Sequence, residues 1–134
     1  MSLNKILLEE IVTAALKEDF AVAGDITTDN LISDTQKAEA RIILKEAGLI
    51  YGLETAAAVF AKLEGEVKLR PLVEEGQKLK KGTPIAELEG SAKSILKGER
   101  TALNFLQRLS GIATRTHKFV ELVRDYPVQI VDTR

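Results

Sequence analysis

Apolar residues recur along the chain with two periods, which predict an alternation of helices and strands. Residues 4–18 and 53–63 place apolar side chains every three or four positions, as an amphipathic helix does. Residues 37–44 alternate small or apolar side chains with polar ones, as a half-buried strand does. Residues 67–90 predict a strand, a turn and a second strand, and Pro71 indicates that the first of these lies at an edge or bends.

The same periods predict which side chains face the core. In the first helix the shared apolar face consists of Leu7, Ile11, Ala14 and Ala15. In the first strand the inward positions are Ala38, Ala40, Ile42 and Leu44. The segment between them, residues 18–30, is rich in Asp, Thr and Asn, so it predicts a loop. Its aspartates lack the spacing of a calcium loop and indicate turns at Asp19, Asp25 and Asp29.

The last third of the chain predicts two helices and a strand. The helices are residues 91–110, with an interruption near Gly98, and residues 112–125. Pro127 precedes a run that predicts a buried strand at residues 128–133. We expect about four strands in one sheet, with the helices of residues 4–18 and 53–63 on one side of it, which is an α+β fold.

The stretch VEEGQKLKKGTPIAELEG, residues 73–90, resembles the hairpin of biotinyl and lipoyl half-barrels. In such modules a carrier lysine occupies a tight exposed turn with hydrophobic or methionine neighbours. Lys80 and Lys81 lack such neighbours and are interpreted as solvated turn charges. The resemblance therefore predicts the shape of the hairpin without the carrier chemistry.

Composition narrows the class of protein. The hydrophobic fraction of 45% and the charged fraction of 29% are typical of a globular domain. The sequence has no cysteine, which excludes disulfides and thiolate metal sites and fits a cytoplasmic location. Acidic residues follow the N-terminus too closely for a signal peptide, and no apolar run is long enough to span a membrane.

Charge is distributed unevenly along the sequence. The net charge of −1 argues against a nucleic-acid-binding protein. Residues 91–134 nevertheless contain eight basic and four acidic residues, a local excess of +4. Such an excess suits a small polyanion such as a phosphorylated metabolite, and the alternative is a solvated helix surface.

The stretch ERTALNFLQRLSGIAT, residues 99–114, places an acid on the apolar face of its predicted helix. Glu99 falls within the arc formed by Ala102, Leu103, Leu106 and Leu109. If Gly98 is the N-cap, Glu99 lies in the first turn, where unpaired backbone N–H groups and the helix dipole stabilise a carboxylate. We therefore expect a structural role for Glu99.

A polar stripe made of Arg100, Asn104 and Gln107 borders the apolar face of the same helix. A stripe in this position can reach a neighbouring surface. From composition alone Arg100 is a solvated side chain, and substrate binding is the alternative. We expect Asn104, Gln107, Ser110 and Thr114 either to support the fold or to hold substrate-binding residues in place.

The same stretch resembles, almost residue for residue, a signature of the quinolinate phosphoribosyltransferase family (nicotinate-nucleotide pyrophosphorylase, carboxylating). ALKEDFAVAGDITTDNLI, ILKEAGLIYGLETAAAVF, VEEGQKLKKGTPIAELEG and the final VDTR resemble other parts of that family in the same order. The resemblance covers nearly the whole chain. It implies a sandwich-like or half-barrel-like N-terminal domain at residues 1–110 and the first elements of a truncated α/β barrel at residues 111–134.

The resemblance also implies a reaction and its binding residues. The family combines quinolinate with phosphoribosyl pyrophosphate to give nicotinate mononucleotide, pyrophosphate and carbon dioxide in de novo NAD biosynthesis, with Mg²⁺ on the pyrophosphate. Carried over by motif, Arg100 reaches quinolinate in the active site of a partner subunit, within a homodimer or larger homo-oligomer. Thr133 and Arg134 match substrate-binding residues at the end of a barrel strand.

Alternatives to this activity remain open. Family members continue past the motif that ends at Arg134, and the later barrel strands carry most of the phosphate-binding and metal-binding residues. We therefore expect the isolated chain to be inactive and to hold no metal by itself. A related phosphoribosyltransferase, of the nicotinate type or associated with molybdate transport, would share the fold. The third possibility is a non-catalytic half-barrel module that binds a partner protein.

Overall fold

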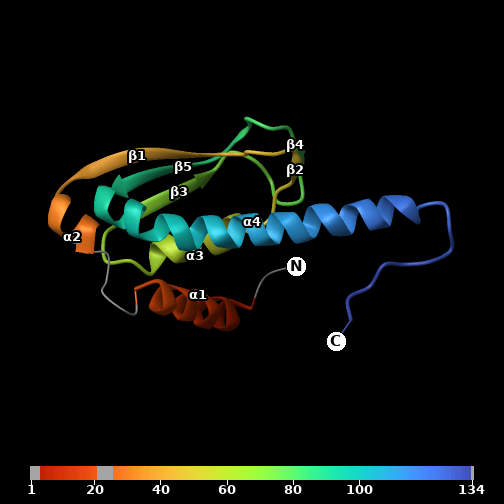
Figure 1. Cartoon of the computed structure of the whole chain (residues 1–134), viewed down its shortest axis with the longest axis horizontal. Helices are drawn as coiled ribbons and strands as arrows, with labels where there is room; N and C mark the ends of the chain where they lie inside the picture. Colours follow the sequence, from red (N-terminus) through yellow and green to blue (C-terminus); the bar gives the residue numbers. More distant parts are fainter. Residues whose placement is uncertain (1–3, 21–25, 134) are drawn as a thin grey trace.

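The computed structural model describes residues 4–20 and 26–133 (Figure 1). Its elements are, in chain order, α1 (Lys5–Phe20), α2 (Ile26–Leu31), β1 (Lys37–Ile43), β2 (Gly48–Leu49), α3 (Leu53–Ala61), β3 (Val67–Pro71), β4 (Lys78–Leu79), β5 (Pro84–Ser91) and α4 (Ala92–Leu122). The predicted α+β class is therefore confirmed. The turn predicted at Asp25 lies outside the described residues.

The described strands form two sheets rather than the single sheet that the sequence predicts. Three strands pair antiparallel in the order β1–β5–β3, and β2 pairs antiparallel with β4. β5 is the central strand, and its Ile85, Ala86 and Leu88 are buried. β3 is an edge strand and ends at Pro71, which fits the prediction, because proline lacks the N–H that an inner strand donates.

The strand register separates a core-facing row of side chains from a solvent-facing row. On the core side, Leu88 of β5 lies between Ala40 of β1 and Leu69 of β3. One position away, the solvent-facing row consists of Arg41, Glu87 and Arg70. Glu87 forms ion pairs with both arginines, of which Arg70 contributes most to holding the pKa of the Glu87 carboxyl below its ordinary value. The alternation predicted for residues 37–44 is thus confirmed.

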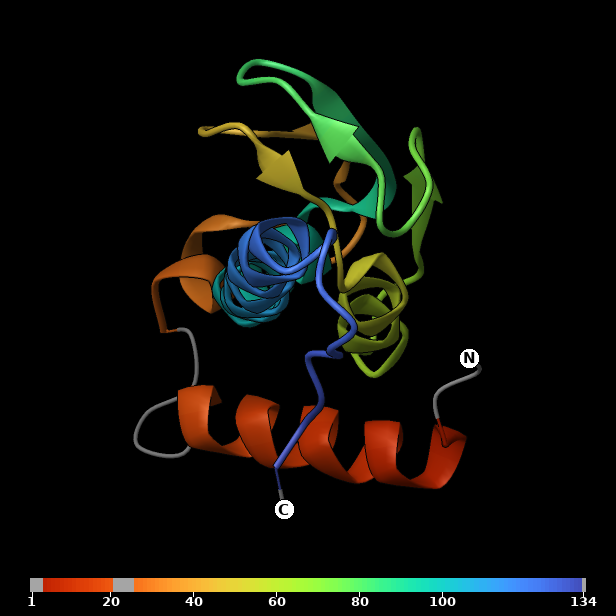
Figure 2. The ribbon, with the colours of Figure 1, turned by 90° about the vertical axis from the view of Figure 1, so that its right-hand side faces the viewer.

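The helices lie on one side of the three-stranded sheet, in two layers (Figure 2). α3 and α4 lie side by side beneath the sheet, and α1 crosses below them. The buried apolar core gathers side chains from α1, α3, α4 and β5 together with Ile50; it consists of Val12, Leu16, Ile50, Leu53, Ala56, Val59, Phe60, Ile85, Ala86, Leu88, Ile95, Ala102 and Leu106. Both helices expected on one side of the sheet are there, with α1 in the outer layer.

The N-terminus of α3 is capped by a side chain from elsewhere in the chain. Its N-cap residue is Gly52, which has no side chain to cap the helix. Glu75, in the loop between β3 and β4, accepts hydrogen bonds from the backbone N–H groups of Leu53 at 2.7 Å and Gly52 at 2.9 Å. A carboxylate in this position also interacts favourably with the helix dipole. Glu75 therefore fixes this loop to the start of α3.

Replacing Glu75 by alanine should lower the free energy of unfolding by about 1–2 kcal/mol, because it removes the cap. Denaturation by urea would measure the loss. The matched control is Glu74→Ala, which removes the neighbouring exposed acid of the same loop and should change the free energy by less than about 0.5 kcal/mol. Equal losses in the two variants would show that Glu75 does not act as a cap.

The buried face of α1 differs from the predicted one. Leu7 and Ile11, expected to face inward, are both 55% exposed, whereas Val12 and Leu16 are buried and Leu8 packs against the core. The helix carries two neighbouring apolar stripes, and both satisfy the helical period. Packing against α3 and α4 selects the stripe through Val12 and Leu16, a choice that the period alone does not make.

The loop predicted over residues 18–30 is wrong at both ends, since residues 18–20 belong to α1 and residues 26–30 to α2. Two of the aspartates expected in turns belong to helices, Asp19 to α1 and Asp29 to α2. Both carboxylates face partners on α4 that are distant in the sequence. Contacts of this kind override the local turn preference of aspartate.

The two helices predicted at the C-terminal end are one helix, α4, of 31 residues. Its N-cap is Ser91, whose hydroxyl accepts a hydrogen bond from Ser94 N at 3.3 Å. Gly98 neither begins nor interrupts the helix; it is buried, and a Cβ added to it would lie 2.6 Å from Cε1 of Phe60. The glycine therefore allows α4 to approach α3 closely.

The strand predicted at residues 128–133 is absent, since these residues follow α4 without helix or strand structure. Val128, Ile130 and Val131 are 55%, 44% and 72% exposed. A strand requires hydrogen-bonded neighbours, and no other segment of the described residues pairs with this one. The prediction of a buried strand is therefore wrong for the described residues, because an apolar run forms a strand only where a neighbouring segment pairs with it.

Candidate substrate-contact site on α4

The second half of α4 holds the segment around β2 through two hydroxyl groups. Ser110 Oγ accepts from Tyr51 N and donates to Tyr51 O, both at 3.0 Å. One turn later, Thr114 Oγ1 accepts from Leu49 N at 2.9 Å and donates to Leu49 O at 3.5 Å. Each hydroxyl thus satisfies both backbone groups of one residue, as a neighbouring strand would. The structural roles expected for Ser110 and Thr114 are confirmed.

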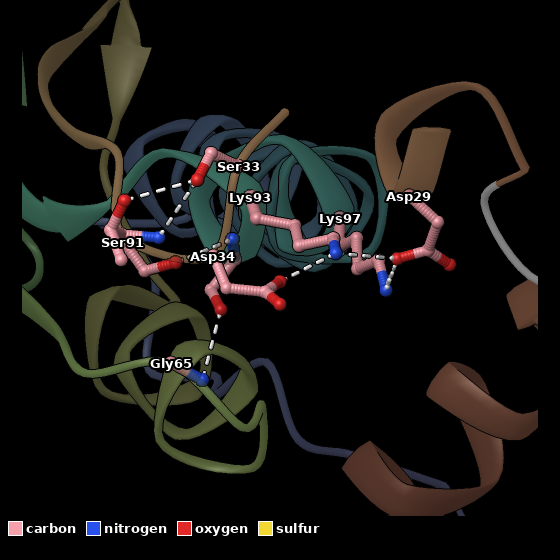
Figure 3. Close-up of polar contacts among 9 residues, drawn as sticks. Asp29, Ser33, Asp34, Gly65, Ser91, Lys93 and Lys97 are labelled. Atoms are coloured by element: carbon pink, nitrogen blue, oxygen red, sulfur yellow. Dashed lines mark hydrogen bonds and ion pairs between the residues drawn. The ribbon is translucent and has the colours of Figure 1, made fainter. Parts of the chain in front are cut away.

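The first turns of α4 are tied to α2 and the following loop by ion pairs (Figure 3). Lys93 Nζ lies 2.6 Å from Asp34 and 3.3 Å from Asp29, and Lys97 Nζ lies 2.6 Å from Asp29. The hydrogen bond from Lys97 is the main cause that holds the pKa of the Asp29 carboxyl below its ordinary value. The lysine side chains are only 19% and 24% exposed, so this cluster docks α2 on α4.

Arg100 lies on the next turn of α4 and is arranged differently. Its side chain is 79% exposed, and its Nη1 lies 3.5 Å from Oδ1 of Asp19, at the end of α1. This distance is longer than that of a good charge-assisted hydrogen bond. A guanidinium has five N–H donors, so the side chain retains the capacity to bind an anion.

Glu99 is exposed, in contrast to the expectation that it faces the core at the start of a helix. It is the eighth residue of α4 because the helix begins at Ala92. The buried stripe runs through Gly98, Ala102 and Leu106, at intervals of four residues, and Glu99 lies one residue beyond it. The acid therefore has solvent around it and needs no special stabilisation in this chain.

The three residues predicted to bind substrate are not brought together. Arg100 lies in the first third of α4, whereas Thr133 is exposed in the segment that follows the opposite end of that helix (Figure 1). Arg134 lies outside the described residues. A site that needs both Arg100 and Thr133 is therefore not assembled within the described part of one chain.

The described residues form a cleft of about 630 Å³ between α1, the loop after α3 and the start of α4. Its charged lining consists of Lys17, Asp34, Lys62, Glu64, Lys93 and Lys97. Arg100 and Thr133 do not line it. Within residues 4–20 and 26–133, no three His, Cys, Asp or Glu side chains gather to hold a metal ion.

Sequence reasoning missed the acids that meet α4, namely Asp19, Asp29 and Asp34. The available signal was the spacing of Lys93, Lys97 and Arg100, which places three cations on successive turns at the start of one helix. Three aspartates lie within a short segment upstream of the first strand. Matching a group of acids to a row of cations would have indicated that this segment lies on α4.

Comparison with known proteins places this arrangement in a family. Residues 25–110 match the family described as quinolinate phosphoribosyl transferase, N-terminal domain. A mitochondrial quinolinate phosphoribosyltransferase (decarboxylating) of Nicotiana tabacum is 35% identical over 127 residues, which are 95% of this chain and 36% of that protein. None of the helices in the described residues is both long and apolar enough to cross a membrane.

Solved structures agree with the sequence match. The nicotinate-nucleotide pyrophosphorylase from Francisella tularensis superposes with a TM-score of 0.90 at 35% identity, over 99% of this chain and 47% of that one. NadC from Streptococcus pyogenes gives a TM-score of 0.93 at 34% identity, over 100% of this chain and 47% of that one. The chain thus spans less than half the length of the relatives that it matches. It belongs to the quinolinate phosphoribosyltransferase family, and residues 25–110 correspond to the N-terminal domain of that family.

Proposed function

We propose that these residues act as the N-terminal part of an enzyme that converts quinolinate and phosphoribosyl pyrophosphate to nicotinate mononucleotide, pyrophosphate and carbon dioxide. Family membership, together with one observation, carries the proposal: Arg100 is exposed on α4 and does not line the cleft described above. Such a side chain suits an anion presented by a second surface. Quinolinate is that anion, since it carries two carboxylates.

Arg100 would bind one carboxylate of quinolinate in the active site of a partner subunit. The planar guanidinium can donate two parallel hydrogen bonds to a carboxylate and stays charged at every working pH. Helix α4 would present it, because the helix is packed under the sheet on one side and leaves most of this side chain exposed. The partner would be a second copy in a homodimer or larger homo-oligomer.

Thr133 and Arg134 would bind substrate in the active site of their own chain. In this proposal residues 1–110 form a sandwich-like or half-barrel-like domain, and residues 111–134 are the start of an α/β barrel. The segment 128–133 would become the first barrel strand once parallel neighbours are present, and its apolar side chains support this assignment. Helix α4 crosses residue 110 and would join the two parts.

Mg²⁺ would enter with phosphoribosyl pyrophosphate and neutralise charge on the pyrophosphate. The described residues do not fit a metal site, so no step is assigned to the ion here. What this part of the chain contributes is positioning and charge, which are the main sources of catalysis when a charged leaving group departs from a bound substrate.

The absence of cysteine from the sequence supports a cytoplasmic location.

The test is pyrophosphate release by a full-length enzyme that contains residues 1–134, with quinolinate, phosphoribosyl pyrophosphate and Mg²⁺. We expect release of pyrophosphate and carbon dioxide with quinolinate, and none when nicotinate replaces it. The 134-residue chain alone should show no turnover. Activity with nicotinate instead would identify a related phosphoribosyltransferase, and turnover by the isolated chain would show that the site was misplaced.

A further inference from the structure

Asp19 contacts two adjacent residues of α4 with its two carboxylate oxygens. Oδ2 accepts a hydrogen bond from the hydroxyl of Thr101 at 3.2 Å. Oδ1 lies 3.5 Å from Nη1 of Arg100. Thr101 is 4% exposed and so is fixed within the core of the helix packing. One oxygen thus anchors the carboxylate, and the other faces the exposed arginine.

In the Asp19–Arg100 pair the basic side chain is the more exposed partner, whereas in the neighbouring lysine pairs the acidic side chain is the more exposed one. Where Lys93 and Lys97 meet Asp34 and Asp29, the cations are sheltered, the acids are the more exposed partners and the shortest distances are 2.6 Å. In the Asp19 pair the acid's side chain is only 20% exposed, although the residue as a whole is exposed, and the arginine side chain is 79% exposed. The lysine pairs hold α4 against α2 and the loop that follows it. In the Asp19 pair, by contrast, an anchored carboxylate lies beside an exposed arginine side chain.

A fixed carboxylate beside Arg100 reduces the conformational freedom that the arginine loses when it binds a ligand. An unrestrained arginine loses rotamer freedom when it is immobilised by a ligand, and this loss opposes binding. A neighbouring anchored charge restricts the side chain beforehand and so reduces that loss. At 3.5 Å the contact is long, and it engages one nitrogen, so the remaining donors of the fork stay available to a second carboxylate.

We propose that Asp19 is a positioning residue, which orients the Arg100 guanidinium for a substrate carboxylate. This inference rests on the proposed function, in which Arg100 binds quinolinate. Thr101 contributes to this positioning, because its hydroxyl keeps the Asp19 carboxylate in place. Asp19 itself does not touch the substrate; it acts through Arg100.

The experiment is a double-mutant cycle in the full-length enzyme that contains this chain. Asp19→Asn keeps the size of the side chain and an oxygen that can accept from Thr101, but removes the charge that faces Arg100. We expect the KM for quinolinate to rise about threefold to tenfold, with the KM for phosphoribosyl pyrophosphate unchanged. In an Arg100→Ala background, Asp19→Asn should have no further effect on the quinolinate KM.

Controls separate positioning from structure and from the proposed function. Asp34→Asn removes an acid of the neighbouring lysine cluster and should leave the quinolinate KM unchanged, while Asp19→Glu should restore part of the loss. An equal loss from Asp19→Asn with and without Arg100 would mean that Asp19 only docks α1, which overturns the inference. If Arg100→Ala raises the quinolinate KM but Asp19→Asn does not, the positioning role alone fails. An unchanged KM in Arg100→Ala overturns both the positioning role and the proposed function.

Discussion

Full-length chains carrying Arg100→Ala and chains carrying Arg134→Ala should each be nearly inactive, and mixing them should restore about a quarter of the normal activity. In the proposed dimer Arg100 serves the partner's site and Arg134 serves its own. A mixed dimer therefore has one site with both lesions and one site with neither. Random exchange makes about half of the dimers mixed, and each of these has one intact site of two.

The recovery must be compared with the activity that each single variant loses. A charge-assisted hydrogen bond to a carboxylate contributes roughly 1.5–3 kcal/mol, so Arg100→Ala should lower kcat/KM by about tenfold to a hundredfold. Arg108→Ala, which removes an exposed arginine two turns further along α4, should have little effect. Subunit exchange must be verified separately, for instance with chains of different mass. If exchange occurs and activity does not return, Arg100 does not act across an interface.

Gly90→Ala should destabilise the protein more than the loss of any cap, by about 3 kcal/mol or more. Gly90 lies near the end of β5 with a φ of +146°, a conformation that residues with a side chain rarely adopt. A Cβ there would lie 2.1 Å from the backbone oxygen of Glu66 and 2.9 Å from the Cα of Val67. Both atoms belong to the backbone at the start of β3, so the clash can be relieved only by moving a strand.

Gly82→Ala is the matched control for strain without a clash. Gly82 also has a positive φ, +85°, but a Cβ there would meet no atom within 4 Å. Its loss should be limited to the cost of a left-handed conformation, about 1–2 kcal/mol. Urea denaturation of both variants would compare them directly. Similar losses at the two glycines would show that the approach of β5 to the Glu66 backbone can relax, contrary to this prediction.

Strand β1 and helix α3 were predictable from the sequence because their pattern and their packing agree. In β1 the alternation of Ala40 and Ile42 with Arg41 matches the burial of a sheet with one face covered. In α1 the pattern allowed two faces, and the position of α3 and α4 decided between Ile11 and Val12. Information of that kind is not local, so no reading of residues 5–20 alone could supply it.

The candidate site was predicted in part, for a related reason. Arg100 stood out because a family motif marks it, and its exposure agrees with a free binding side chain. Asp19 was read as a turn residue because its partner on α4 is 82 positions away in the sequence. The strand predicted at residues 128–133 is wrong because a strand forms only by pairing with another segment, and no described segment pairs with this one.

The length of α4 has a mechanical consequence. A helix rises about 1.5 Å per residue, so the 22 steps from Arg100 to Leu122 separate the arginine from the end of the helix by about 33 Å. One residue inserted into that part of the helix would shift its far end by about 1.5 Å and rotate it by about 100°, while the sheet at the near end stayed as it is. If Arg100 and the segment after α4 serve the sites of one dimer, as proposed, the number of residues between them is constrained as well as their chemistry, because the helix sets both the distance and the rotation between its two ends.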